Sequence, residues 1–234
     1  MRPIADCSSL RTFERYARDL GRSVGTLRDA DVLISGILAP AEAAASGKAG
    51  FDELREILAR ERQRRRDEVR LTLRGSVWTK LQLYLTLWPR TLDENPRLDR
   101  PVVGHGRKAL RKTWKKAAKL GRRLEKLDAE ERHEMRKVLK KLRYQAEFFA
   151  PLFARKESEC FIERLKTLQD VFGYINDVRM APKLAELCEQ GGANTLAERA
   201  TGYAEGYHEA RTAHVWRDAG GAWRGLKRAK RFWD

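Results

Sequence analysis

The segment from residue 129 to 149 constrains the fold of this chain most, because its apolar and charged residues separate at the period of an α-helix. At about 100° per residue, one stripe is entirely apolar and the opposite side is mostly cationic. Asp128 and Glu131 form a capping-box pattern ahead of it, and Ala150 precedes Pro151, where helical geometry is disfavoured. The sequence therefore predicts a helix over 129–149 that buries one face and exposes the other. The apolar stripe contains Met135, Val138, Leu139, Leu142, Ala146 and Phe149, and the opposite side contains His133, Arg136, Lys137, Lys140, Arg143 and Tyr144.

Helical patterns dominate the rest of the chain, and the alternation typical of β-strands is scarce. Glycine and proline clusters mark breaks between the helical segments. The fold class predicted from these patterns is all-α. The expected breaks are 39–50, 89–106, 190–194 and, more weakly, 220–221, and the expected helices are 8–24, 29–38, 51–87, 107–126, 129–149, 157–172, 176–189 and 194–232.

An internal repeat organises these helices into two halves. Residues 20–29 align with residues 168–177, with matching Leu, Gly and Asp, and each copy is followed by a long helical segment. We expect each copy to be a helix closed by glycine, then a tight turn, then an Asp that caps the next helix. The chain is thus predicted to be one domain of two pseudo-symmetric helical-bundle halves with long antiparallel helices, 1–100 and 101–234. The closing glycines are Gly25 and Gly173, and the expected caps are Asp29 and Asp177.

The repeat also predicts a missing element. His133 precedes Leu168 by 35 residues, so the counterpart of the basic helix would begin about as far ahead of Leu20, before Met1. The first half is therefore expected to be incomplete at its N-terminus. Three alternatives explain this absence. They are a misplaced start, a truncation, or a true loss of one wall of the site.

Positive charge is concentrated in one third of the chain. The net charge is +16, and residues 107–143 alone hold sixteen Lys and Arg against five Asp and Glu. Such a field attracts nucleic acid, anionic lipid or another phosphate polymer. The alternative explanation is an ordinary solvated helix face, which long charged side chains commonly cover. Few acids compensate the cations on that face, since Glu134 and Glu147 lie toward its flanks.

Several classes of protein are disfavoured. The N-terminus lacks the apolar run of a signal peptide, and no segment reaches the length of a membrane span, which predicts a soluble cytoplasmic protein without membrane contact. Cys7, Cys160 and Cys188 are far apart and contain no CxxC pair. His133-Glu134 begins like a zinc-protease motif, but Lys137 stands where the second histidine is needed. We expect no metal and no cofactor.

Four segments of the chain resemble parts of one known family. The pattern His133-xx-Arg136-xxx-Lys140-Lys141-Leu142-Arg143-Tyr144 with Glu147-Phe148-Phe149, and the block at 165–177, are similar to the second half of the CHAD domain (conserved histidine α-helical domain). Residues 20–33 look like the corresponding first-half segment, and 223–233 are similar to the end of the domain. The resemblance covers nearly the whole chain. It implies two four-helix bundles around a basic channel that binds inorganic polyphosphate, in a protein often found on polyphosphate granules.

The resemblance also implies a set of binding residues. It maps the family's histidine and basic positions onto His133, Arg136, Lys140, Lys141 and Arg143, and Lys137 lies beside them. Polyphosphate is charged at each internal phosphate, so charge-assisted contacts from arginine forks and lysine point charges suit it. His133 is expected to gain charge beside phosphate, which predicts tighter binding as the pH falls from 7.5 to 6. A helix cap or a core hydrogen bond is the alternative role for His133.

Other functions remain as alternatives at this stage. An RNA- or DNA-binding helical protein would use the same phosphate contacts, although no zinc finger, RRM or KH signature is present. CHAD domains are often fused to CYTH triphosphatase domains, but Glu157-Ser158-Glu159 is followed by Cys160-Phe161 where that motif needs an ExExK strand. With no P-loop and no nucleophile beside a base, we predict no catalytic residues and no enzyme activity.

Two further groups of residues have ordinary and functional interpretations. The tryptophans recur with aliphatic residues at helical spacing, so we expect core packing rather than base stacking. The basic end of the chain is interpreted as a solvated tail, with a second phosphate contact as the alternative. The tryptophans are Trp78, Trp88, Trp114, Trp216 and Trp223, and the basic end contains Lys227, Arg228, Lys230 and Arg231.

Overall fold

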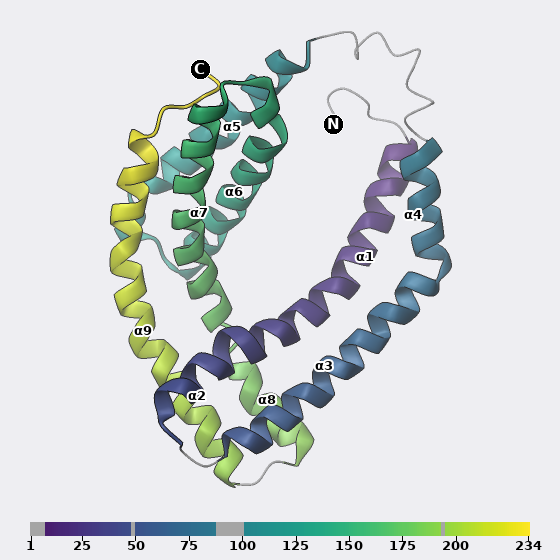
Figure 1. Ribbon diagram of the computed structural model, residues 1–234, viewed down its shortest axis with the longest axis vertical. Coiled ribbons are helices and arrows are strands. Elements are labelled where there is room, and N and C mark those ends of the chain that lie inside the picture. Colours follow the sequence, from purple (N-terminus) through teal and green to yellow (C-terminus); the bar gives the residue numbers. More distant parts are fainter. Residues whose placement is uncertain (1–7, 48–49, 88–100, 193–194) are drawn as a thin grey trace. The chain divides into compact units, whose positions relative to one another are not determined.

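The computed structural model describes residues 8–47, 50–87, 101–192 and 195–234, and every regular element in these ranges is helical (Figure 1). The all-α prediction is confirmed. The chain divides into two compact units, of which unit 1 contains 1–100 with 180–205 and unit 2 contains 101–179 with 206–234. Residues 180–205, expected in the second half, thus group with unit 1. The assignment of the whole chain to one domain of two pseudo-symmetric halves stays a prediction.

Unit 1 is built on a long helix, α1, that packs against α3 and α4. The Nε of Arg62 on α3 lies 2.6 Å from the Asp31 carboxylate on α1, and the hydroxyls of Ser23 and Thr72 are 3.0 Å apart. The elements of unit 1 are α1 (Ser8–Val32), the π-helix η1 (Leu33–Leu38), α2 (Ala39–Ala45), α3 (Phe51–Arg74), α4 (Ser76–Leu87), α8 (Pro182–Gly191) and the beginning of α9 (Thr195–Arg228).

The glycines of the internal repeat do not form the predicted turns. Gly25 lies inside α1 and Gly173 inside α7 (Arg155–Val178), so the prediction of a glycine-closed helix and a capping Asp is wrong in both copies. A glycine inside a helix costs only about 1 kcal/mol relative to alanine, which the packing of a long helix outweighs. The helix α9 likewise runs through the weak break expected at 220–221.

Other boundaries follow local backbone geometry. Gly192 adopts the left-handed conformation (φ 65°) and ends α8 inside the expected break at 190–194. Gly75 is extended, so the helix predicted over 51–87 is split into α3 and α4. Gly50 has φ 99°, and a Cβ there would lie 2.0 Å from the backbone oxygen of Leu196, so only glycine fits.

Unit 2 contains the helix predicted first from the sequence. Its capping box is present, with the Glu131 N–H donating to Asp128 Oδ1 at 2.8 Å, and all six residues of its predicted apolar stripe are buried. This helix, α6, packs against both α5 and α7. The elements of unit 2 are α5 (Val102–Gly121), η4 (Leu124–Lys126), α6 (Ala129–Phe149), η5 (Ala150–Leu152), α7 and the remainder of α9.

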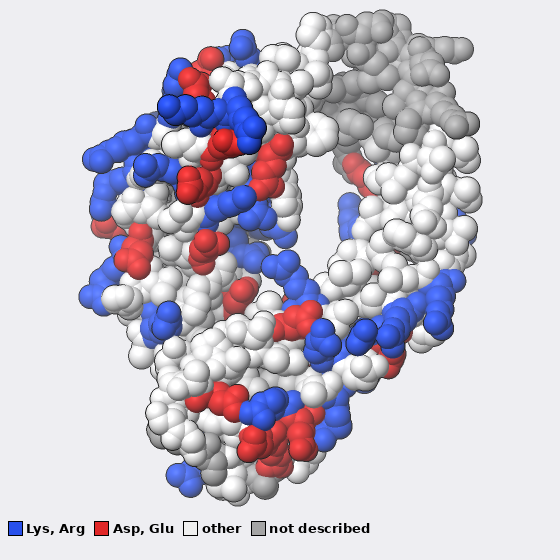
Figure 2. Space-filling model, in the orientation of Figure 1, with Lys and Arg blue, Asp and Glu red and all other residues white. Residues whose placement is uncertain are grey.

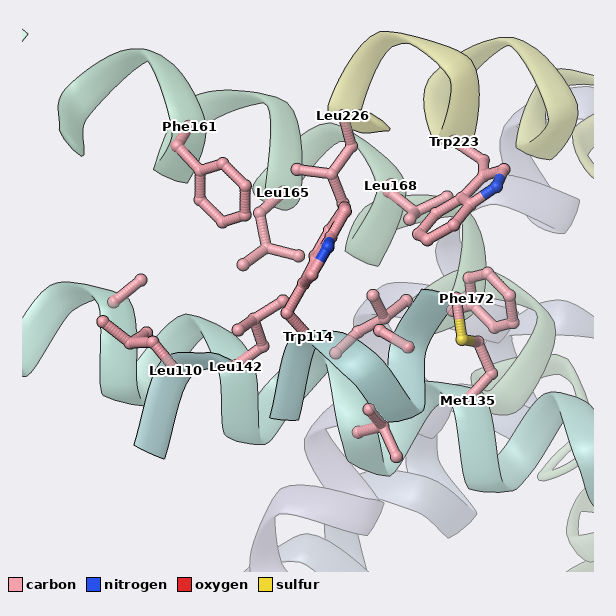
Figure 3. Close-up of a cluster of buried hydrophobic side chains, with 14 of the residues drawn as sticks. Leu110, Trp114, Met135, Leu142, Phe161, Leu165, Leu168, Phe172, Trp223 and Leu226 are labelled. Atoms are coloured by element: carbon pink, nitrogen blue, oxygen red, sulfur yellow. The ribbon is translucent and has the colours of Figure 1, made fainter. Parts of the chain in front are cut away.

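Aromatic side chains fill much of the core of unit 2. Figure 3 shows Trp114 of α5 and Trp223 of α9 among aliphatic side chains of α6 and α7, and the two indoles stack with their centroids 5.7 Å apart. A Cβ on Gly121 would come within 2.1 Å of the Trp223 ring, so glycine is required for this packing. The core role predicted for Trp114 and Trp223 is confirmed, whereas Trp88 and Cys7 lie outside the described residues.

Candidate functional site

The cations of α6 are distributed over two flanks of the helix, and the first flank faces α7. His133 Nδ1 lies 3.3 Å from the Asn176 amide oxygen on α7. Farther along, Arg143 Nε and the Lys166 Nζ of α7 each lie 3.8 Å from the same Glu147 carboxylate oxygen. Arg136 and Lys140 follow His133 by three and seven residues and therefore lie on the same side. We call His133, Arg136, Lys140 and Arg143 the α7-side row.

The second flank of α6 faces α5. Lys137 Nζ bonds to Glu134 Oε2 at 2.6 Å, and this bond is the largest cause of the lowered pKa of Glu134. Lys116 on α5 lowers that pKa further, which places it near Glu134. Lys141 follows Glu134 by seven residues and therefore shares its flank. Lys141 thus lies toward α5, whereas Lys137 follows His133 by four residues and so borders the α7-side row.

Few acids neutralise the α7-side row. Glu147 is the only acid from Met135 to Phe149, and its distance of 3.8 Å from Arg143 is too long for a hydrogen bond. The Nε of Arg143 is buried without a hydrogen-bond partner among the described residues, and Arg136 and Lys140 form no ion pair within them. The row therefore has donors and positive charge available for an anion. In the view of Figure 2, Lys and Arg side chains gather over the α5–α7 region, with acids between them.

The surface of α7 that faces this row is polar and open. Lys166, Gln169, Gly173 and Asn176 follow one another at helical spacing and so share one side. The Gln169 Nε2 is buried without a partner among the described residues, and a Cβ on Gly173 would meet no atom within 4 Å. Gln169 and Asn176 belong to the block at 165–177 that resembles the family, but they were not predicted as neutral donors. Their spacing from Lys166 was the signal that could have revealed them.

His133 and His208 differ in burial and in their hydrogen-bond partners. His133 is exposed and is neither a helix cap nor a core residue. His208 is fully buried and hydrogen-bonds to the Tyr174 hydroxyl at 2.9 Å, and burial raises the pKa of Tyr174.

Within the described ranges no group of three or more His, Cys, Asp or Glu side chains could hold a metal ion. None of the helices described is both long and apolar enough to cross a membrane.

The protein is helical in every regular element described, and the α7-side row gives one of its helices a cationic face. The sequence profile of the CHAD domain matches residues 1–186, most of the chain, so the protein belongs to the CHAD domain family. It is similar to the crystal structure of the CHAD domain from the plant Ricinus communis, with 27% sequence identity and a TM-score of 0.79, over 98% of this chain and 75% of that one. No curated protein matches the chain.

Proposed function

We propose that this protein binds inorganic polyphosphate along the α7-side row and does not cleave it. CHAD domains are associated with polyphosphate binding in general and are generally non-catalytic. For this chain, the observation that supports the proposal is the row itself, in which three cations and an imidazole lie on one helix side, with Glu147 beside Arg143 and Glu134 beside the imidazole. Association with polyphosphate granules in the cytoplasm would follow from this binding.

The shape of the row suits a linear polyanion. His133 and Arg143 are ten residues apart, which corresponds to about 15 Å along the helix axis. Arg136 and Arg143 can each grip two oxygens with a planar fork, while Lys140 acts as a point charge between them. Asn176 and Gln169 add neutral donors from α7. Because these contacts read phosphate oxygens and no base edges, they require no sequence in the ligand.

A pair of matched double variants tests the position of the site. Arg136→Ala with Lys140→Ala removes two charges from the α7-side row, and Lys137→Ala with Lys141→Ala removes two from the part of the same exposed side that lies nearer α5. We expect the first variant to weaken binding of long-chain polyphosphate about 100-fold in a titration, since charge-assisted hydrogen bonds contribute about 1.5–3 kcal/mol each. The second should weaken it less than about fivefold. Equal losses would mean that net charge alone attracts the ligand.

Competition with RNA tests the class of ligand. At equal phosphate concentration, long-chain polyphosphate should displace a bound single-stranded RNA from the wild-type protein. If RNA instead displaces bound polyphosphate, the result would support a nucleic-acid-binding protein. Release of inorganic phosphate from polyphosphate with Mg²⁺, abolished by Lys140→Ala, would refute the non-catalytic part of the proposal.

A further inference from the structure

A second cationic site lies in unit 2, between α5 and the end of α9. Two cavities of about 800 and 570 Å³ adjoin there, because Trp114, Arg122 and Arg231 line both. Seven Lys and Arg residues line the two cavities together, against one acid, Asp234. No residue of the α7-side row is among them. We call the combined space the α5–α9 pocket.

The arrangement of α5 separates this pocket from the site on α6. Arg111 and Lys115 are four residues apart and so project from one side of α5, and Arg122, the C-cap, follows Lys115 by seven residues. Lys116 instead lies near Glu134 of α6. The facing cations are Lys227, Lys230 and Arg231, which follow the core residue Leu226. The basic end of the chain therefore forms a wall of a cavity and is more than a solvated tail.

The one acid of the pocket occupies the position that an anionic ligand would take. The two carboxylate oxygens of Asp234 bind different arginines, Oδ1 at 3.1 Å from Arg111 Nε and Oδ2 at 2.6 Å from Arg231 Nε. Exposed pairs of this kind contribute only about 0–1 kcal/mol, so a multiply charged anion can displace the carboxylate. Lys115, Arg122 and Lys227 form no ion pair within the described residues, whereas Lys230 bonds to Glu157 at 2.5 Å.

The aromatic wall of the pocket contains an unsatisfied donor. Trp233, which lines the smaller cavity, is fully buried, and its indole N–H has no hydrogen-bond partner among the described residues. A buried donor without an acceptor costs about 1–3 kcal/mol. Because Trp233 is 0% exposed, an anionic oxygen in the pocket accepts from this N–H only after the ring shifts. Trp114 and Trp223 also line the pocket but are only 8% and 6% exposed, which leaves no free ring face for stacking a base.

We propose that the α5–α9 pocket binds a short condensed-phosphate group, such as a triphosphate, at a site separate from the α7-side row. Clefts of about 300–1,000 Å³ are typical of small-ligand sites, and each of the two adjoining cavities has such a volume and an excess of cations. The Asp234 carboxylate holds Arg111 and Arg231 in place until phosphate displaces it. The triphosphate can come from a free oligophosphate or from a nucleotide, because the pocket contacts the phosphates and not a base.

Titration of the full chain with tripolyphosphate, ATP and AMP tests this proposal. The fluorescence of Trp114, Trp223 and Trp233 should report binding in the pocket, and calorimetry gives the affinity. We expect Lys115→Ala with Arg122→Ala to weaken tripolyphosphate binding at least tenfold. Asp234→Asn should strengthen it about threefold to tenfold, since a competing charge is removed and two guanidinium groups are freed. The exposed pair Lys126→Ala with Lys156→Ala, outside both sites, is the charge-matched control.

The outcomes separate this proposal from the one for the α7-side row. Loss of tripolyphosphate binding in the Lys115–Arg122 variant, with long-chain polyphosphate binding still dependent on Arg136 and Lys140, supports two sites. Tripolyphosphate binding that is lost only with Arg136→Ala and Lys140→Ala, or equally in the charge-matched control, overturns the pocket proposal. Similar affinities for ATP and tripolyphosphate, with weaker AMP binding, identify the phosphate group as the ligand. Preference for AMP would refute it.

Discussion

The helices α3 in unit 1 and α6 in unit 2 are both long, amphipathic and rich in cations, but the cations of α3 are paired with acids more completely. On α3, Arg64 and Arg65 each bond to both Glu61 and Glu68, at distances of 2.7–3.2 Å. These bonds outweigh the burial of Glu61, which alone would raise its pKa, and hold that pKa below its usual value. On α6, Arg136 and Lys140 have no such partners among the described residues. The number of cations is therefore a weaker guide to an anion site than the number left unpaired.

The buried faces of α3 and α6 should contribute equally to stability, so that the two helices differ only in their exposed faces. Leu54 of α3 and Leu142 of α6 are both 0% exposed. Each change to alanine should lower the free energy of unfolding by about 3 kcal/mol, from lost burial and the cavity left behind. Urea denaturation measures both values. Leu83→Ala, at a side chain 53% exposed, is the control and should cost less than about 0.5 kcal/mol. A small effect at either buried leucine would contradict equal packing.

Removing the acids that bind Arg64 and Arg65 should turn the exposed face of α3 into a weak anion site. In the Arg136→Ala, Lys140→Ala background, Glu61→Gln with Glu68→Gln should raise polyphosphate affinity about fivefold, equivalent to about 1 kcal/mol. The reason is that Arg64 and Arg65 lose the acids that bind them. Glu186→Gln with Glu189→Gln on α8 changes the net charge equally without freeing a paired arginine. If both pairs raise the affinity alike, pairing on α3 is not what prevents binding there.

The third prediction concerns the repeated glycines, one in each unit. Gly25 and Gly173 lie inside helices without positive φ angles, and a Cβ at either position would meet no atom within 4 Å. Alanine at either position should stabilise its unit by about 0.5–1 kcal/mol, because the unfolded chain loses conformational freedom that glycine would retain. Thermal unfolding of the two single variants tests this. Destabilisation at only one position would show that the repeat is less equivalent than its sequence suggests.

The fourth and smallest effect concerns the imidazole in the α7-side row, which α3 lacks. Polyphosphate favours the charged form of an imidazole, so binding beside His133 should strengthen about threefold as the pH falls from 7.5 to 6. Asn176 faces this imidazole from α7, and Glu134 lies beside it on α6. His133→Gln should flatten the pH profile relative to the wild type. An unchanged profile in the variant would assign the pH dependence to other groups.

The buried face of α6 was predictable residue by residue, and the position of the glycines was not. The apolar stripe from Met135 to Phe149 follows from the helical period alone, and Asp128 with Glu131 defines the start. In contrast, Gly25 and Gly173 carry local turn signals that the packing of α1 and α7 overrides. Local propensities of about 1 kcal/mol decide boundaries only where no larger interaction competes.

The amino-acid sequence by itself determined the helical class, the core-facing side of α6 and the concentration of positive charge, because each depends on periodicity or composition along one element. Only the tertiary structure decided which cations share a surface. A helix has two flanks, and whether a side chain shares a surface with Asn176 of α7 or with Lys116 of α5 depends on which neighbour packs there. The pocket beside Trp233 arises for the same reason, since α5 and the end of α9 are about one hundred residues apart in the chain and meet only in the folded protein.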